Sequence, residues 1–470
     1  MTDALLQELG AILGPQHVLT GEAAAPYLTD WRKLVRGRAR FVLRPGSTDE
    51  VAAVMRACAA HGVPVVPQGG NTGQVAGGVP GPDGGAVLLS LARMNRVHAI
   101  DTENDTITVE AGCVLQAVQQ AAEEAGRLFP LSLGAEGSCT IGGNLGSNAG
   151  GTQVLRYGNA RELCLGLEVV LPDGEVWHGL RGLRKDNSGY DLRDLFIGSE
   201  GTLGIITAAT LKLFPLPAAR CTALAALGSI QGAGRFLGRC RAGFNAALTG
   251  FELMSGACLR LVTETYPQQR TPFATLDAPW YVLLEISDAE DEAHGQARLE
   301  TVLGGALEAG EISDVAVSQT LSQTRSLWHL RESITLALAE DGKCIKHDVS
   351  LPASTIPDFV EHTDTALQRQ FQGVRSFIFG HLGDGNLHYN VARPKAADDA
   401  ALHAMQPGLS ELVHDAVHAL GGSISAEQGI GRIRTADLAR YKQPVELRLM
   451  RAIKQALDPK GLMNPGVLLP

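Results

Sequence analysis

Two histidines seven residues apart, His381 and His388, lie in the stretch of this chain whose residue types best suit chemistry. On a helix this spacing would separate them by about 10 Å, too far to share an ion. Residues 383–386, Gly-Asp-Gly-Asn, are turn formers with apolar neighbours on both sides. A hairpin with this turn would place His381 opposite His388, about 5 Å away, which suits two imidazoles on one metal ion. The alternative is a hairpin with two surface histidines, and the spacing alone leaves both open.

The composition restricts the class of protein that could carry such a site. The chain has 470 residues, 45% of them hydrophobic and 19% charged, so two or three globular domains are expected. Its net charge of −10 argues against nucleic acid or an anionic membrane as the main partner. No apolar run approaches the roughly 20 residues of a membrane span, and the first residues lack a basic leader pattern.

The eight cysteines are scattered and form no Cys-x-x-Cys pair. This pattern excludes a ferredoxin-type cluster and a common zinc ribbon. We therefore expect buried, reduced thiols and a cytoplasmic protein.

The helices and strands expected before residue 217 differ in length and arrangement from those expected after it. Strands and helices alternate over 38–112, and two strands flank the turn at 172–174. Beyond residue 217, helices at 229–246, 290–308, 319–340 and 356–371 alternate with strands near 280–287, 312–318, 344–351 and 375–391, which indicates an α+β layer domain. Residues 400–420 and 431–457 are expected to be helical.

Glycine is abundant, with 55 residues, and it clusters at 69–85, 134–151 and 198–204. The first cluster follows a predicted strand at 63–66 and begins Gly-Gly-Asn-Thr-Gly. Such a loop presents several backbone N–H groups, and a nest of this kind can hold a pyrophosphate. The alternative is a plain tight turn. The pattern is not the Rossmann fingerprint, because no Gly-x-Gly-x-x-Gly follows a first strand.

In their order and spacing the three loops resemble the FAD-binding domain of the vanillyl-alcohol oxidase-type flavoproteins. The resemblance implies an α+β fold with an FAD-binding domain at 1–216, a substrate domain with an antiparallel sheet at 217–420, and a C-terminal helical segment at 421–470 that packs back on the flavin. No histidine lies between His61 and His98, and Cys139 is expected to be unlinked, so FAD should be bound non-covalently. The implied FAD contacts are Gln68, Gly69, Gly70, Asn71, Thr72, Gly73, Gln74, Gly78, Leu133, Gly134, Gly137, Ser138, Gly142, Gly143, Asn148, Gly201, Ile206 and Asn464.

The stretch 379–390, together with Ser-Ala-Glu-Gln-Gly-Ile-Gly at 425–431 and Asn-Pro-Gly at 464–466, narrows the resemblance. The chain is similar to the D-2-hydroxyacid dehydrogenase branch of these flavoproteins, and most to the D-2-hydroxyglutarate dehydrogenases. This implies that His381, His388 and Glu427 hold a divalent metal, with zinc expected. Two nitrogens, one carboxylate and an open position form the catalytic zinc pattern in their own right. For Glu427 alone, the alternative is a solvated loop carboxylate.

Arg331 and Thr335 are four residues apart on a predicted helix, so they share a face. A guanidinium beside a hydroxyl can clamp a carboxylate, although a surface arginine is the more common outcome. The resemblance implies that Arg331, Thr335 and Lys346 bind the substrate carboxylates and that Asn390 lies near the substrate. A third cation would suit a dicarboxylate better than lactate.

One residue departs from the family pattern. Relatives usually carry a histidine after the metal-binding glutamate and use it as the general base, whereas this chain has Gln428 at this catalytic position. Glutamine cannot accept that proton. Either no base is needed there, or His347 or another group substitutes, or activity is weak.

The resemblance implies oxidation of a D-2-hydroxy acid, D-2-hydroxyglutarate or a similar dicarboxylate, to the 2-oxo acid. The hydride would pass from C2 to flavin N5 with help from the metal, and a separate acceptor, an electron-transfer flavoprotein or a quinone, would take the electrons. The alternatives are a D-lactate-type dehydrogenase, an oxygen-using oxidase, or a flavin-binding protein without catalysis. Relatives are often dimers, so a homodimer is possible.

Overall fold

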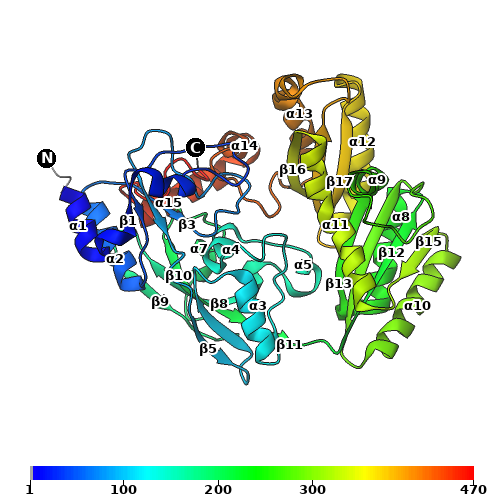
Figure 1. Ribbon diagram of the computed structural model, residues 1–470, viewed down its shortest axis with the longest axis horizontal. Helices are drawn as coiled ribbons and strands as arrows, with labels where there is room; N and C mark the ends of the chain where they lie inside the picture. The colour runs from blue at the N-terminus through cyan, green and yellow to red at the C-terminus, as the bar shows by residue number, and fades with distance from the viewer. Residues whose placement is uncertain (1–3, 470) are drawn as a thin grey trace. The chain divides into compact units, whose positions relative to one another are not determined.

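The computed structural model describes residues 4–469, which form two compact units. Unit 1 contains the residues up to Gly150, Gly158–Leu216 and the chain from Glu427 onward. Unit 2 contains Pro217–Ala426 and one short segment, Gly151–Tyr157, taken from the middle of the N-terminal half. Figure 1 shows the helices and strands of both units, coloured by residue number.

Unit 1 begins with a small sheet whose strand order is β1-β2-β4-β3. Strands β2, β4 and β3 are parallel, and their residues are almost all buried, as expected for a covered parallel sheet. Helix α2 begins at its N-cap Ser47, whose Oγ accepts from the Glu50 N–H, and it buries its apolar stripe. The bounds are β1 (Val18–Leu19), β2 (Val42–Leu43), β3 (Val65–Gln68), β4 (Val87–Ser90), α1 (Ala4–Leu13) and α2 (Thr48–Ala60).

A second, antiparallel sheet of unit 1 has the order β5-β6-β10-β8-β9. Its central strand β10 begins where the third glycine loop ends, so the sheet carries that loop. The remaining elements of this unit up to residue 216 are β5 (Val97–Asp101), β6 (Thr106–Glu110), α3 (Leu115–Glu124), β7 (Arg127–Leu128), α4 (Ile141–Ser147), α6 (Ala160–Leu163), β8 (Cys164–Val170), β9 (Val176–Gly179), α7 (Arg193–Phe196), β10 (Ile205–Lys212) and β11 (Phe214–Pro215).

The C-terminal segment belongs to unit 1 and extends its first sheet. The Val65 N–H donates to the Leu462 carbonyl, and the Asn464 N–H donates to the Val65 carbonyl, so the tail runs parallel to β3. The single helix expected over 431–457 is wrong. The structure has two helices, α14 (Thr435–Tyr441) and α15 (Pro444–Leu457), because Pro444 holds Gln443 in an extended conformation.

Unit 2 is built on a seven-stranded antiparallel sheet of order β15-β12-β14-β13-β17-β18-β16. The bounds are β12 (Ala219–Leu227), β13 (Leu248–Ser255), β14 (Trp280–Asp288), β15 (Asp314–Val317), β16 (Cys344–Ser350), β17 (Arg375–His381) and β18 (Asn386–Ala392). The sequence pattern did not indicate β12 or β13.

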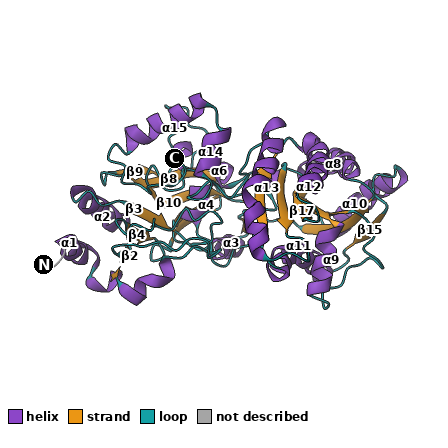
Figure 2. Ribbon diagram, turned by 90° about the horizontal axis from the view of Figure 1, so that it is seen from above, coloured by secondary structure: helices purple, strands orange, loops and turns teal. Residues whose placement is uncertain are grey.

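Helices cover both faces of this sheet, as Figure 2 shows. The larger apolar core packs the sheet against α8 (Ile230–Phe244), α10 (Glu292–Glu308), α12 (Ile356–Gln370) and α13 (Asp399–Ala419). The smaller core on the other face packs it against α9 (Gly256–Thr265) and α11 (Leu321–Asp341). The short helix α5 (Val154–Tyr157) packs on β13. Among residues 4–469, no helix combines the length and the apolar character needed to cross a membrane.

Candidate functional site

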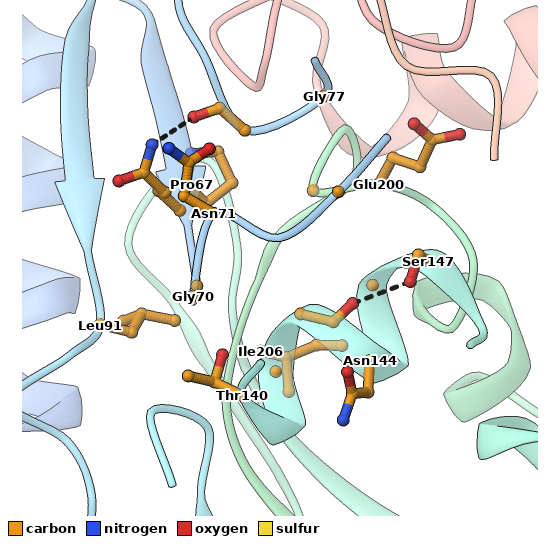
Figure 3. Close-up of a pocket in the computed structure, with 18 of the residues that line it drawn as sticks. Pro67, Gly70, Asn71, Gly77, Leu91, Thr140, Asn144, Ser147, Glu200 and Ile206 are labelled. Atoms are coloured by element: carbon orange, nitrogen blue, oxygen red, sulfur yellow. Dashed lines mark hydrogen bonds between the residues drawn. The ribbon is translucent and has the colours of Figure 1, made fainter. Parts of the chain in front are cut away.

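A cavity in unit 1 lies between the three glycine loops (Figure 3). It encloses about 1040 Å³ of space that is partly open to solvent. One wall is the loop after β3, another is helix α4 with the residue before it, and the third is the turn that leads into β10. Gln428 also lines it. Of the predicted FAD contacts, those that line the cavity are Gln68, Gly69, Gly70, Asn71, Thr72, Gly73, Gly78, Gly142, Gly143, Gly201 and Ile206.

Two glycines show positions in these walls where a side chain would clash with a neighbouring loop. A Cβ on Gly70 would lie 2.0 Å from the Ser138 carbonyl oxygen, so the first and second loops are in direct backbone contact. Gly201 has φ +69°, and a Cβ there would lie 2.4 Å from the Pro67 ring. The third loop therefore lies directly against the residue that precedes Gln68.

The C-terminal segment ties the loops together through polar contacts. The Glu200 carboxylate accepts from the backbone N–H groups of Ile430 (2.8 Å) and Gly431 (2.7 Å). Burial raises the pKa of Glu200 above its ordinary value, and these two bonds only partly offset that effect. The Asn464 amide donates to the carbonyls of Gly77 and Glu200. These contacts fix the first and third loops before any ligand arrives.

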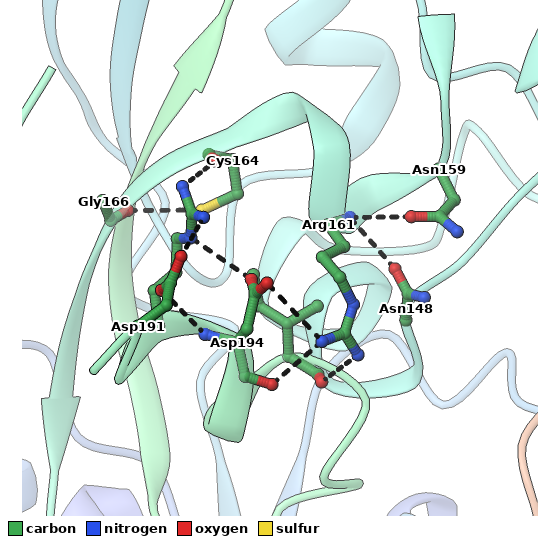
Figure 4. Close-up of polar contacts among 9 residues, drawn as sticks. Asn148, Asn159, Arg161, Cys164, Gly166, Asp191 and Asp194 are labelled. Atoms are coloured by element: carbon green, nitrogen blue, oxygen red, sulfur yellow. Dashed lines mark hydrogen bonds and ion pairs between the residues drawn. The ribbon is translucent and has the colours of Figure 1, made fainter. Parts of the chain in front are cut away.

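An arginine network supports the third loop from behind (Figure 4). The Arg161 guanidinium donates to the carbonyls of Asp194 (3.0 Å) and Ile197 (2.8 Å), which lie just before the loop. The Arg161 backbone N–H donates to Asn148 Oδ1 at the end of α4. The predicted FAD contact Asn148 thus uses its side-chain oxygen to join α4 to α6. It lies outside the cavity lining, as do Gln74, Leu133, Gly134, Gly137, Ser138 and Asn464, and their assignment as FAD contacts stays a prediction.

The cavity fits FAD on two observations. Thr140 Oγ1 is buried on its wall and has no hydrogen-bond partner among the described residues; Asn464 Oδ1, beside the loops, is likewise buried and unpartnered within 4–469. Buried polar atoms of this kind need a partner that the protein itself does not supply. Leu91, Phe196 and Ile206 add apolar surface to the wall, as a flat aromatic ring system requires.

The predicted metal-binding and substrate-binding residues of unit 2 lie on the sheet face that α9 and α11 cover. Side chains alternate along each strand, and the even-numbered residues of β16, β18 and β13 beyond its bulge at 248–250, with the odd-numbered residues of β17, point to this face. The sequence-predicted residues on it are Lys346, His381, His388 and Asn390, and Arg331 faces it from α11.

The hairpin exists, but its predicted register is wrong by two residues. His388 pairs with Phe379, and His381 lies beyond the last pair. The turn covers residues 382–385, closed by the N–H groups of Asp384 and Gly385 donating to the His381 carbonyl, and Arg241 donates to the Gly383 carbonyl. A shift of two keeps every side chain on its face. The His381 and His388 ring centroids therefore still lie 5.7 Å apart.

A buried glutamate joins His381 to Arg331. Glu252 Oε1 lies 2.6 Å from His381 Nδ1, and Oε2 accepts from the Arg331 Nε (2.9 Å) and lies 2.8 Å from its Nη2. Burial alone would raise the pKa of Glu252, but His381 and Arg331 outweigh it and bring that pKa to about 2. The Arg331 guanidinium also lies 4.8 Å above the Phe379 ring.

His388 has a carboxylate beside its Nδ1 as well, with Asp348 Oδ1 3.6 Å away. Burial lowers the pKa of His388 far below its ordinary value, so the imidazole is neutral at pH 7, the form that binds metal. Asp348 also accepts from the backbone N–H of Ala426. Since Glu427 follows Ala426 directly, this bond holds the backbone that leads into Glu427.

His381, His388 and Glu427 offer ligand atoms that all lie within 4.8 Å of one another. Two imidazole nitrogens and one carboxylate oxygen are the donor set of a catalytic zinc site with an open position. The donor chemistry therefore fits a divalent metal.

The other predicted substrate residues lie around this cluster. Lys346 is paired with Asn390 across β16 and β18, and Asp348 is paired with His388, so these four side chains share one face. Thr335 lies one turn after Arg331 on α11 and is half-buried.

His347 cannot serve as the substitute base for this cluster, because it lies on the opposite face of the sheet. Its Nδ1 contacts the Tyr389 carbonyl oxygen at 2.9 Å, and its Nε2 contacts Ser410 Oγ on α13 at 3.0 Å. Strand alternation separates it from its neighbours Lys346 and Asp348.

Sequence reasoning missed Glu252. A signal was present, since it is the one charged residue in the run Leu248–Ser255, and a lone carboxylate in an apolar strand needs a buried partner.

Two family models match the chain. One is described as an FAD binding domain and matches residues 39–179; the other is described as the C-terminal domain of FAD linked oxidases and matches residues 216–468. Together they match most of the chain, with residues from both units.

Curated relatives match over nearly the full length. A mitochondrial D-2-hydroxyglutarate dehydrogenase of Bos taurus is 41% identical, covering 97% of this chain and 82% of the relative. A D-2-hydroxyglutarate dehydrogenase of Xanthomonas citri pv. viticola is 41% identical, covering 94% and 92%. Among solved structures, p-cresol methylhydroxylase has a TM-score of 0.78 at 16% identity, covering 98% of this chain and 95% of that one, which shows a shared fold.

Proposed function

The chain belongs to the FAD-linked oxidases related to D-2-hydroxyglutarate dehydrogenase, and from this premise we propose that it oxidises D-2-hydroxyglutarate or a similar dicarboxylate to the 2-oxo acid. As a member of this family it is an FAD-dependent oxidoreductase that acts on the CH–OH group of a D-2-hydroxy acid. The choice of acid, the metal and the electron acceptor are the parts that we propose.

The observation that carries the proposal is the grouping of His381 and His388 with the buried cation Arg331 on one face of one sheet. A 2-hydroxy acid presents a hydroxyl and a carboxylate on adjacent carbons. Metal-ligand side chains beside a guanidinium match that pair of groups. Lys346 on the same face adds a second cation, which favours a substrate with a second carboxylate.

The residues have the following proposed roles. When bound, FAD supplies the hydride acceptor, and Thr140 and the glycine loops would hold it. A divalent metal held by His381, His388 and Glu427, with zinc as our choice, would supply Lewis acidity toward the substrate hydroxyl. Arg331 and Thr335 bind and orient one carboxylate, and Lys346 with Asn390 takes the other end.

FAD is bound without a covalent link in this proposal. Burial raises the pKa of Cys139, which keeps this thiol protonated and unreactive. His98, the first histidine after the first loop, lies on β5 and not on the cavity wall.

The proton of the hydroxyl leaves without a side-chain base at position 428. Gln428 can donate or accept a hydrogen bond, but its amide does not take up a proton at neutral pH. His347 lies on the other face of the sheet and cannot replace that base. Loss of the proton without a side-chain base is therefore the simplest of the alternatives for the described residues.

The electrons pass to a separate acceptor, an electron-transfer flavoprotein or a quinone, because the scattered cysteines offer no iron–sulfur ligand set. We propose a cytoplasmic location on the basis of these reduced, mostly buried cysteines, although relatives from eukaryotes are named mitochondrial. A homodimer also stays a proposal.

The test is anaerobic bleaching of the flavin absorbance by D-2-hydroxyglutarate, D-lactate and D-malate, with and without a chelator. We expect D-2-hydroxyglutarate to bleach the flavin fastest and the chelator to stop it. Faster bleaching by D-lactate would move the substrate to a monocarboxylate. Bleaching that resists metal removal would refute the metal, and no bleaching by any acid in a yellow, metal-loaded protein would refute the activity.

A further inference from the structure

Glu252 is the least exposed charged residue of unit 2 among those that the structure describes, and it is almost completely buried. It lies on β13 in the middle of the sheet, paired with Leu283 of β14 on one side and with β17 on the other. Its cross-strand partner on β17 is His381 itself. A carboxylate in such a place is unfavourable unless every lone pair finds a donor.

Both carboxylate oxygens have a partner, and the partners differ. Among residues 4–469, Oε1 contacts the imidazole of His381, whereas Oε2 contacts the guanidinium of Arg331. His381 thus belongs to the metal cluster and Arg331 to the carboxylate clamp, and the two are joined through one side chain.

The contact with His381 determines the tautomer of that imidazole. An ionised carboxylate can only accept a hydrogen bond, so Nδ1 must carry the proton. The other nitrogen, Nε2, then keeps its lone pair for a metal ion. A carboxylate behind a metal-ligating histidine commonly strengthens metal binding in this way.

We infer that Glu252 is a positioning residue that holds His381 ready for the metal and Arg331 ready for the substrate carboxylate. The inference deepens the proposed function and rests on it for the identity of the substrate. Glu252 touches neither metal nor substrate in this scheme. Its loss should therefore weaken both kinds of binding while the sheet remains folded.

The test replaces Glu252 with glutamine and uses Glu285→Gln as the matched control. Glu285 is also a buried carboxylate, on the neighbouring strand β14, but its contacts are Trp328 Nε1 (2.8 Å) and Thr222 Oγ1 (3.2 Å). Zn²⁺ affinity is measured on the purified flavoproteins by competition with a chromophoric chelator. We expect Glu252→Gln to weaken Zn²⁺ binding by about 10- to 100-fold and Glu285→Gln to leave it within about twofold.

A second experiment measures the KM for the hydroxy acid at saturating Zn²⁺, which reports on carboxylate binding by Arg331. We expect Glu252→Gln to raise the KM for the hydroxy acid by on the order of tenfold, with a smaller change in kcat, because Arg331 loses a charged hydrogen bond. Unchanged Zn²⁺ affinity and unchanged KM in a folded Glu252→Gln protein would overturn the inference. Equal losses in Glu285→Gln would also overturn it, since they would show a general effect on the sheet.

A double variant keeps the test decisive if Glu252→Gln leaves Arg331 uncompensated and does not fold. Glu252→Gln with Arg331→Gln removes both charges together, which is far less costly than removing one. Zn²⁺ affinity should fall in the double variant and stay normal in Arg331→Gln alone. Because the Zn²⁺ arm needs no turnover, a wild-type protein that oxidises no hydroxy acid would refute the proposed function without touching the role of Glu252 toward His381.

Discussion

Replacing Gly146 with alanine should stabilise the apoprotein and weaken its binding of FAD. Gly146 lies in helix α4 on the wall of the cavity. A Cβ at this position would meet no protein atom within 4 Å, and its φ is not positive. The methyl group would therefore stand in the space that we assign to FAD.

The magnitude of each effect follows from simple thermodynamics. Glycine inside a helix costs about 0.5–1 kcal/mol relative to alanine, so the free energy of unfolding of the apoprotein should rise by about that amount. FAD at a hundredfold excess over its Kd adds about 2.7 kcal/mol to the wild type. If the methyl group weakens binding tenfold, the same FAD concentration adds only about 1.4 kcal/mol. The variant should thus be more stable than the wild type without FAD and less stable with it.

The assay is urea unfolding of apo and FAD-loaded protein, with Kd from flavin fluorescence. Gly10→Ala is the control, since Gly10 lies in helix α1 of the same unit, also with open space around its Cβ, but not on the cavity wall. It should show the same gain and the full FAD increment. A Gly146→Ala protein that keeps the full increment would refute the placement of FAD along this wall.

Three further outcomes are expected. Gln428→His introduces a group that titrates near pH 6.5, so the bleaching rate should gain a pH-dependent limb there; an unchanged rate and pH profile would show that a base at this position is not limiting. The hydrogen bond that His294 donates to Asp288 raises the pKa of His294; for Asp288, burial raises the pKa, but His294 together with the Glu290 N–H and Arg298 outweighs burial and lowers it. The pair thus stabilises the fold mainly between about pH 3.8 and pH 6.5, and its effect is lost as the pH rises through the raised pKa of His294 or falls through the lowered pKa of Asp288. His294→Gln should therefore lower the urea midpoint at about pH 5.5 and not at about pH 9, and equal losses at both would contradict the assignment. Finally, seven of the eight cysteines are buried and only Cys344 is partly exposed, so Ellman's reagent should label no more than that thiol in the native protein, and rapid labelling of a second would contradict the burial.

Much of the local structure could be predicted because it depends on neighbours in the sequence. The helices at 229–246, 290–308, 319–340 and 356–371 agree with α8, α10, α11 and α12 to within a few residues. Their apolar spacing and their caps are short-range signals. The two missed strands, β12 and β13, are apolar runs, which periodicity alone does not distinguish from buried helix.

The position of His347 could also have been deduced from the sequence. In a strand at 344–351, alternation places Lys346 and His347 on opposite faces. If Lys346 faces the substrate, His347 cannot. The register of the hairpin was not open to such an argument, because a tertiary contact from Arg241 on α8 supports the turn at 382–385.

The sequence by itself determined which chemistry this protein carries: three glycine loops for a dinucleotide, and two histidines on one face of a hairpin. Residue type and the period of two along a strand are local properties, and even a register shift of two residues leaves the histidines together. The tertiary structure alone decided that Glu252 joins His381 to Arg331. Glu252 is 79 positions from Arg331 and 129 positions from His381 in the sequence. No local pattern encodes which distant donors a buried carboxylate will meet, because that depends on the strand order of the whole sheet.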